Sequence, residues 1–249
     1  METAALVAAH VRELDRCNQR GGRMLSLVDL LEAGTVDLPL AGYLAAAMRQ
    51  GSSLLAGAVP GGAGKTTVMA ALLNWLPDGV VLRPADGAMA PAGEPSSVCC
   101  VAHEIGRGPY FAYVWGQQAR DFFALTRRGY LVATNLHADT LEQTRQQLGG
   151  ENGVPAADLE RVHLKVYLRA ERGPGWSYRR AVSAVWENDG SGDRLIWTGE
   201  RDESFRRQAP STLVTADDEA RHAGIVGDLQ RRGLRRIEEV RGALLSGGF

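Results

Sequence analysis

A glycine-rich segment between an apolar stretch and a helix-forming stretch constrains this chain more than any other feature. Residues 53–59 (Ser-Leu-Leu-Ala-Gly-Ala-Val) have the composition of a buried strand, and residues 65–76 predict a helix that Pro77 and Gly79 bring to an end. Residues 61–64 (Gly-Gly-Ala-Gly) lie between them and allow a tight turn. This order of strand, turn and helix predicts an α/β unit in which the first backbone N–H groups of the helix point at one spot.

Phosphate oxygens are the natural partners of such N–H groups, so the segment predicts a nucleoside triphosphate site, with ATP and Mg²⁺ as the expected ligands. Lys65 would reach the β- and γ-phosphates, and the hydroxyl of Thr66 would ligate Mg²⁺. Lys65 is one of only two lysines in the chain, which makes its place here harder to attribute to chance. The strict pattern has glycine where this chain has Val59, and the alternative interpretation is an ordinary glycine-rich turn. The expected binding residues are Pro60, Gly61, Gly62, Ala63, Gly64, Lys65, Thr66 and Thr67.

Composition narrows the class of protein. The 249 residues suffice for one large α/β domain with helical additions, and a formal net charge of −1 gives no field that would attract nucleic acid. Three cysteines, two of them adjacent, cannot form a disulfide framework, which favours a reducing compartment. The start Met-Glu-Thr lacks the pattern of a signal peptide, and no apolar run has the length of a membrane span. We therefore expect a cytoplasmic protein that does not bind nucleic acid.

Strand and helix patterns alternate between residues 51 and 148, which predicts a mostly parallel, doubly wound sheet with helices on both faces. After Pro155 the segments 162–168 and 180–186 alternate like antiparallel strands, with 194–197 as a third. The expected domains are an N-terminal helical segment (1–50) packed on the core, a P-loop ATPase core (51–210) and a C-terminal helical tail (211–249). The tail carries several arginines, for which a solvated helix face is the simpler interpretation than an acidic partner.

A second candidate segment follows the apolar stretch 130–134 and reads Thr-Asn-Leu-His-Ala-Asp-Thr over residues 134–140. Loops at the carboxyl ends of parallel strands are where such sheets bind ligands. Asp139 can cap the next helix, with Glu142 three residues later completing the capping arrangement. That leaves His137 free either for a role at the γ-phosphate or for an ordinary structural or solvated role.

The order of these segments resembles the secretion-ATPase superfamily, the hexameric motors of type II and type IV secretion, type IV pili and archaeal flagella. The resemblance covers roughly residues 24–190. It rests on the segments 27–35, 41–47, 54–57 and 71–77, on the glycine loop, and on residues 135–139, which look like the histidine box of that family. It implies a P-loop NTPase fold, ATP hydrolysis, a ring-shaped homo-oligomer and a partner in membrane-associated secretion or pilus machinery.

The acidic motif departs from the family pattern, in which an apolar strand ends in Gly-Glu. Residues 113–118 (Tyr-Val-Trp-Gly-Gln-Gln) stand in the corresponding place, so Gln117 replaces the glutamate that would organise the metal and the attacking water. A neutral amide can hold a water but cannot accept its proton. Glu104 is then the best remaining carboxylate, with Asp86 a weaker second, although a solvated loop glutamate is an equally ordinary interpretation of Glu104.

Two further sets of residues have weaker support. Arg107 and Arg120 are candidates for stabilising charge across a subunit boundary, by analogy with arginine fingers. His103 beside Cys99 and Cys100 invites a zinc hypothesis, but the two cysteines point to opposite faces of a strand and no second ligand pair exists.

The leading hypothesis is a P-loop ATPase in which Lys65 holds phosphate, Glu104 polarises water and His137 senses the γ-phosphate. The first rival is a regulatory or switch subunit that binds ATP with little or no hydrolysis, which Gln117 favours. A small-molecule kinase is the third possibility, but the sequence shows no signature of an acceptor site.

Overall fold

The computed structural model describes residues 2–18, 21–59, 61–86, 93–172, 178–200 and 204–247. Its α-helices are α1 (Glu2–Arg16), α2 (Leu27–Glu32), α3 (Leu38–Arg49), α4 (Lys65–Leu73), α5 (Gln117–Ala124), α6 (Leu141–Arg145), α7 (Ala156–Leu159), α8 (Ala216–Arg231) and α9 (Ile237–Leu245). Two 3₁₀-helices, η1 (Pro95–Ser97) and η2 (Leu125–Arg128), and a π-helix, η3 (Gln146–Glu151), accompany them. Its strands are β1 (Leu54–Gly57), β2 (Val81–Pro84), β3 (Val98–Ala102), β4 (Glu104–Ile105), β5 (Tyr113–Val114), β6 (Leu131–Leu136), β7 (Leu164–Arg172), β8 (Tyr178–Asn188), β9 (Asp193–Gly199) and β10 (Phe205–Arg207).

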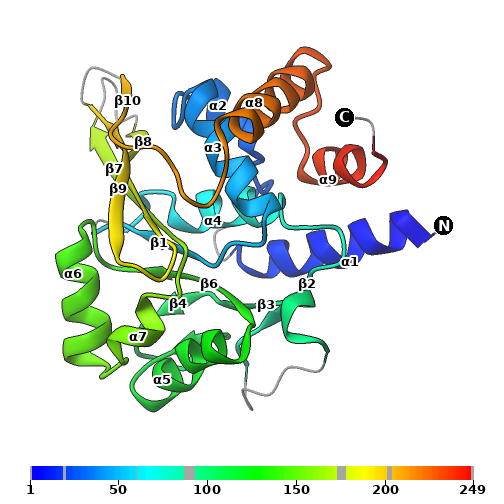
Figure 1. The fold of residues 1–249 in the computed structure, drawn as a ribbon. Helices are drawn as coiled ribbons and strands as arrows, with labels where there is room; N and C mark the ends of the chain where they lie inside the picture. Colours follow the sequence, from blue (N-terminus) through cyan, green and yellow to red (C-terminus); the bar gives the residue numbers. More distant parts are fainter. Residues whose placement is uncertain are drawn as a thin grey trace.

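Eight strands form one twisted sheet in the order β10-β9-β8-β7-β1-β6-β3-β2 (Figure 1). From β7 to β2 all neighbours are parallel, and from β7 to β10 they are antiparallel. The expected fold class, an α/β sheet with an antiparallel extension after residue 155, is therefore confirmed. β10 was not expected from the sequence. The strand that leads into the glycine loop, β1, lies in the middle of the sheet between β6 and β7.

Helices cover both faces of the sheet, and the alternation of side chains along β1 shows how. Leu54 and Ala56 join a core with α1, α2, α3, α4, α8 and α9, whereas Leu55 joins a second core with α5, η3 and α7. Successive side chains of a strand point to opposite faces, so a fully apolar strand requires helices on both sides. Within the described part of the chain, no helix combines the length and apolar character needed to cross a membrane.

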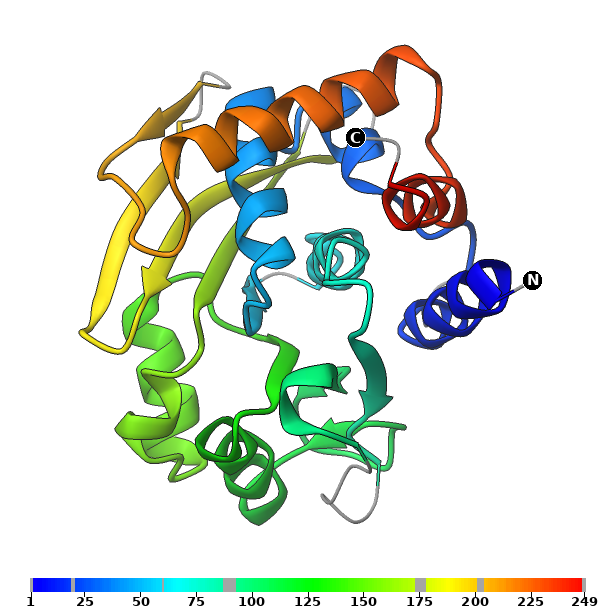
Figure 2. The same ribbon diagram turned by 45° about the vertical axis from the view of Figure 1, so that its right-hand side comes forward.

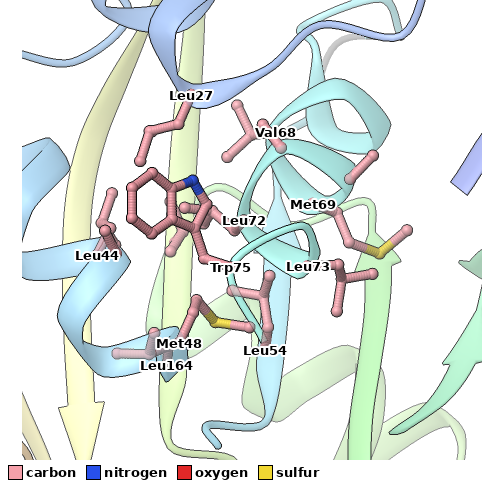
Figure 3. Packing of buried hydrophobic residues seen from close by; sticks show 14 of the residues in the cluster. Leu27, Leu44, Met48, Leu54, Val68, Met69, Leu72, Leu73, Trp75 and Leu164 are labelled. Atoms are coloured by element: carbon pink, nitrogen blue, oxygen red, sulfur yellow. The ribbon is translucent and has the colours of Figure 1, made fainter. Parts of the chain in front are cut away.

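The helix that begins at the glycine loop, α4, is held firmly along its length. Leu72 and neighbouring apolar residues pack with Trp75 against α2, α3 and β1 (Figure 3). At its far end, the buried guanidinium of Arg241 on α9 donates hydrogen bonds to the carbonyls of Asn74 and Pro77, both at 3.1 Å. A cation at the C-terminal end of a helix is favoured by the helix dipole. The start of α4 is thus fixed relative to the sheet.

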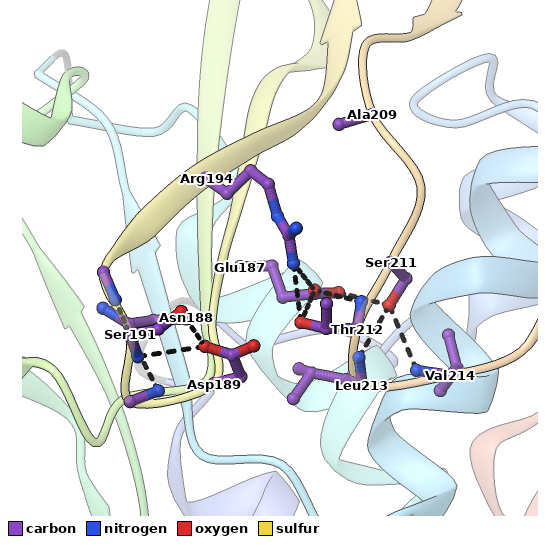
Figure 4. A network of polar contacts seen from close by, with 12 residues as sticks. Glu187, Asn188, Asp189, Ser191, Arg194, Ala209, Ser211, Thr212, Leu213 and Val214 are labelled. Carbon is purple, nitrogen blue, oxygen red and sulfur yellow. Dashed lines mark hydrogen bonds and ion pairs between the residues drawn. The ribbon is translucent and has the colours of Figure 1, made fainter.

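The first and last segments of the chain pack closely on each other. α8 packs across α3 (Figure 2), where a Cβ added to Gly42 would be 2.6 Å from the Cβ of Ala223, so only glycine permits this approach. The carboxylate of Glu187 on β8 accepts hydrogen bonds from Ser211 and Thr212, in the segment before α8 (Figure 4). It also accepts one from the hydroxyl of Tyr43 on α3. The division into domains 1–50, 51–210 and 211–249 remains a prediction. Helices of the N-terminal segment (1–50) pack against helices of the C-terminal segment (211–249), and both segments contribute to the core.

Candidate nucleotide-binding site

Three neighbouring parallel strands bring the predicted site residues to one edge of the sheet. Ala56 of β1 pairs with Asn135 of β6, and Ala102 of β3 pairs with Thr134 of β6. The segments that follow β1, β3 and β6 therefore leave the sheet side by side at the carboxyl ends of the strands. They carry the glycine loop, Glu104 and His137, in that order.

The glycine loop has the backbone shape of an anion-binding turn. Gly62 and Gly64 have φ values of +87° and +96°, in the left-handed region that favours glycine, and they flank the buried Ala63. α4 begins at Lys65, and the residue before it, Gly64, provides no side-chain cap for the first N–H groups. Seven of the eight expected binding residues lie in this stretch, 61–67, while Pro60 is outside the described residues. The loop thus offers uncapped backbone donors at the start of a helix.

Lys65 is buried, with 7% of its surface exposed, and its ammonium points back toward the end of β1. Its Nζ lies 3.5 Å from the carbonyl oxygen of Ala58 and 3.8 Å from Oε1 of Glu104. A buried lysine requires an anionic partner, and Glu104 supplies one in this structure.

Glu104 lies two residues beyond the end of β3, at the start of the short strand β4, and is buried. Its Oε1 is also 3.7 Å from Nε2 of His137, so one carboxylate lies between Lys65 and His137. Oε1 accepts no hydrogen bond from a described residue. Burial raises the pKa of Glu104, while the charge of Lys65 and the imidazole of His137 oppose that shift. The structure therefore brings Lys65, Glu104 and His137 together.

His137 follows β6 directly and has a half-exposed side chain. Its Nδ1 lies 3.5 Å from the carbonyl oxygen of Val59, which places the ring beside the glycine loop. The expected cap of the next helix was wrong by one residue. Thr140 is the N-cap of α6, with its hydroxyl accepting from the N–H of Gln143, because its backbone is extended where the helix begins. Asp139 instead donates its N–H to the Gln143 side chain.

Asn135 is a site residue to which the sequence reasoning assigned no role. Its Nδ2 donates to the carbonyl oxygen of His103 at 2.9 Å and lies 3.2 Å from the hydroxyl of Thr66. A carbonyl can only accept, so the amide orientation follows from the His103 contact. Its Oδ1 is fully buried without a hydrogen-bond partner among the described residues. The signal in the sequence was a polar amide inside an otherwise apolar strand.

Arg180 is a second residue that the sequence did not single out. It lies on β8, and its Nε donates to the carbonyl oxygen of Gly62 in the glycine loop at 2.8 Å. Because 118 residues separate the two in sequence, no local pattern could have predicted this contact.

Gln117 does not lie where the sequence interpretation put it. The preceding strand, β5, pairs only with β4 in a separate two-stranded sheet, so it is not part of the parallel sheet that presents the glycine loop. Gln117 is the first residue of α5, and its amide donates to Asp121 and accepts from Arg120 within that helix. Across this small sheet Glu104 of β4 pairs with Tyr113, not with Gln117, and Glu104 is the carboxylate that lies 3.8 Å from Lys65.

The remaining candidates lie away from Lys65 or are engaged elsewhere. Asp86 is exposed and follows the edge strand β2, two strands removed from β1. Arg107 stacks on Trp115 at 4.9 Å, and Arg120 donates to the carbonyl oxygen of Asn152 at 2.6 Å. A role for either arginine across a subunit boundary stays a prediction.

Comparison with known proteins adds little to this geometry. No protein-family model matches the chain, and no curated protein matches it. Among solved structures, the chain is similar to the VirB11 ATPase from the Brucella suis type IV secretion system, solved in complex with sulphate. The likeness has 20% sequence identity and a TM-score of 0.43, and covers 66% of this chain and 57% of that one. This chain thus spans less than two thirds of the length of that protein, and overlap of this size does not establish an activity.

Proposed function

We propose that this protein binds ATP with Mg²⁺ at the glycine loop and hydrolyses it to ADP and phosphate. The observation that carries the proposal is the convergence of Lys65, Glu104 and His137 beside uncapped N–H groups at the carboxyl ends of three parallel strands. Phosphoryl transfer to water uses positive charge on the phosphates and a group that positions or deprotonates the attacking water, and Lys65 and Glu104 can supply these.

The residues present fit a triphosphate and a divalent cation. Gly62 and Gly64 adopt left-handed conformations that turn the backbone into a concave donor surface, which suits phosphate. The buried oxygens Oε1 of Glu104 and Oδ1 of Asn135 have no hydrogen-bond partner among the described residues, and hard oxygen ligands with their bridging waters are what Mg²⁺ prefers. Thr66 would supply the hydroxyl ligand, and when bound, Mg²⁺ would neutralise charge on the phosphates.

The chain's own residues would then divide the work. Lys65 would leave Glu104 to hold the phosphates, since a triphosphate carries more negative charge than one carboxylate. Glu104, freed from the ammonium, would accept a proton from the attacking water, and a pKa raised by burial suits a base near neutral pH. Asn135 would hold the Thr66 hydroxyl in place, and His137 would contact the γ-phosphate side of the site.

The proposal includes an assembly. In keeping with the sequence resemblance to secretion and pilus motors, we propose a cytoplasmic homo-oligomer, with a hexamer as the expected form, that converts hydrolysis into conformational work beside membrane-associated machinery. Light scattering at high protein concentration with ATP tests this part. A strict monomer under those conditions counts against a motor.

The test of nucleotide binding is the melting temperature with Mg-ATP. At about a hundred times its Kd, ATP should stabilise the fold by about 2.7 kcal/mol, a melting shift of roughly 5–10 °C for a chain of this size. Lys65→Ala should remove most of the shift. Arg83→Ala, which removes one positive charge from an exposed position on the edge strand, should leave it intact. An equal shift in all three proteins would mean that ATP binds elsewhere.

The rival function is an ATP-binding switch with little or no hydrolysis. It rests on glutamine in place of the catalytic carboxylate. The contacts of the Gln117 amide with Asp121 and Arg120 within α5, and the presence of Glu104 beside Lys65, favour hydrolysis over this rival. Phosphate release by the wild type, compared with Lys65→Ala, separates the two functions. Binding without release above the level of the mutant would favour the switch.

A further inference from the structure

Arg180 reaches the glycine loop from the antiparallel part of the sheet, on the far side of β7. Its Nε donates to the carbonyl oxygen of Gly62 at 2.8 Å, and its Cδ would lie 3.2 Å from a Cβ added to Gly64. The aliphatic part of the side chain therefore lies against the loop backbone, and the charged end caps a loop carbonyl. The terminal nitrogens, Nη1 and Nη2, form no hydrogen bond with a described residue.

Because of the geometry of the peptide bond, this contact also determines where the N–H of the next residue, Ala63, points. The Gly62 carbonyl and the Ala63 N–H belong to one planar peptide unit, and the bond is trans, so the two groups point in opposite directions. Holding the carbonyl toward Arg180 therefore aims the N–H of Ala63 away from it. That N–H has no hydrogen-bond partner among the described residues, and Ala63 is buried between two glycines with positive φ.

The charge of Arg180 adds a second effect. A hydrogen bond from a cation to the carbonyl oxygen polarises the peptide unit, which makes the N–H at its other end a stronger donor. Without the arginine, the Gly62 carbonyl loses this partner. The 62–63 peptide can then turn its carbonyl toward the phosphates by rotation about ψ of Gly62, which has no side chain to resist it, and about φ of Ala63. A carbonyl facing a phosphate would repel it.

We propose that Arg180 is a positioning residue for the glycine loop: it fixes and polarises the 62–63 peptide so that the Ala63 N–H faces the bound phosphate. The proposal rests on the nucleotide site proposed above. It also connects β8, and with it the β7–β8 hairpin, to that site through a single hydrogen bond. Arg180 acts through the backbone and does not touch the nucleotide.

The test compares Arg180→Ala and Arg180→Lys with wild type by calorimetric titration of Mg-ATP and Mg-ADP. Losing a well-aligned donor to the phosphates should raise the Kd of both nucleotides by a similar factor, on the order of 10-fold. Arg180→Lys, whose ammonium can still donate to the carbonyl, should retain much of the affinity that Arg180→Ala loses. Arg206→Ala removes the same charge from an exposed position on β10 and should bind as wild type does.

Direct contact between Arg180 and a phosphate predicts a different pattern and would overturn the proposal. The substitution would then raise the Kd of ATP much more than the Kd of ADP, and this difference between the two nucleotides would shrink as the salt concentration is raised. Unchanged affinity in Arg180→Ala, with Lys65→Ala still defective, would also refute a positioning role while leaving the nucleotide site intact.

A measurement without nucleotide tests the proposal even if the wild type binds neither ligand. In protein labelled with ¹⁵N-alanine, the Ala63 amide should give one sharp resonance in wild type and in Arg206→Ala. In Arg180→Ala it should show exchange broadening as the peptide samples two orientations on the microsecond to millisecond scale. An equally sharp Ala63 resonance in Arg180→Ala would refute the proposal.

Discussion

Replacing Glu104 by glutamine is the substitution that tests the catalytic assignment most directly. Glu104→Gln keeps the shape of the side chain and removes both its charge and its ability to accept a proton. Positioned proton transfer contributes about 10²–10⁴-fold to rate, so kcat for phosphate release should fall by that factor, or about 3–5 kcal/mol of barrier.

The structure also fixes the direction of the effect on binding. Glu104 and Lys65 are buried with their charged atoms 3.8 Å apart, a separation at which opposite unit charges attract by about 4 kcal/mol at an effective dielectric constant near 20. ATP must compete with that attraction for the ammonium. Glu104→Gln removes the competitor and one negative charge near the phosphates, so the Kd for Mg-ATP should stay equal or become lower.

The assay combines steady-state phosphate release at saturating Mg-ATP with titration of a fluorescent ATP analogue. Glu142→Gln, which neutralises an exposed carboxylate on α6, is the matched control and should match the wild type in both. An active wild type whose kcat is unchanged by Glu104→Gln would refute the assignment of the base. A large rise in Kd would refute the account of competition for Lys65.

The pH dependence gives an independent check on the same residue. Burial raises the pKa of Glu104, and a base works only when it is deprotonated. The rate should therefore fall with decreasing pH, starting at a higher pH than an exposed glutamate would cause. A rate that stays constant until the ordinary range of a glutamate pKa would show that another group accepts the proton.

Three further substitutions test other parts of the structure. A Cβ at Gly57 would lie 2.3 Å from the carbonyl oxygen of Ala138, so Gly57→Ala should displace the segment after β6. The free energy of unfolding should fall by about 1–3 kcal/mol, measured as a lower midpoint of urea denaturation. Burial would raise the pKa of Glu187, but hydrogen bonds from Ser211 and Thr212 lower it (Figure 4). The contribution of Glu187 to stability is therefore present above the usual glutamate pKa and lost as pH falls through the lowered one. Glu187→Gln should melt at a lower temperature than the wild type at pH 7 and lose less stability on acidification. Gln117→Glu should leave phosphate release unchanged, and a large gain would restore Gln117 to the site.

The fold could be predicted because its signals are local. The alternation of strand and helix patterns specifies a parallel α/β sheet, and apolar residues at every position of β1 require helices on both faces. The start of α3 is equally local, since the side chain of Asp37 accepts from Leu40 N–H three residues later. The order of the strands was not, because pairing between β1 and β6 joins residues that are far apart in sequence.

The same distinction between local signals and contacts of distant residues applies to the candidate site. The glycine loop and the start of α4 form one continuous segment, so their chemistry can be read from neighbouring residues. Arg180 belongs to the same loop in space but reaches it from β8, and no spacing rule connects the two. Asn135 stood inside a segment already singled out, and only its contacts with Thr66 and His103 give it a role.

Gln117 shows why one strand end can be mistaken for another. Residues 98–102 and 113–115 are both short and apolar, and each is followed within two residues by a polar side chain able to hold water. Periodicity cannot decide which of the two enters the central sheet, because a strand is placed by its partners. β3 pairs with β2 on one side and β6 on the other, whereas β5 pairs with β4 alone. β3 is held on both sides and lies next to β6, and Glu104, two residues beyond the end of β3, lies beside Lys65.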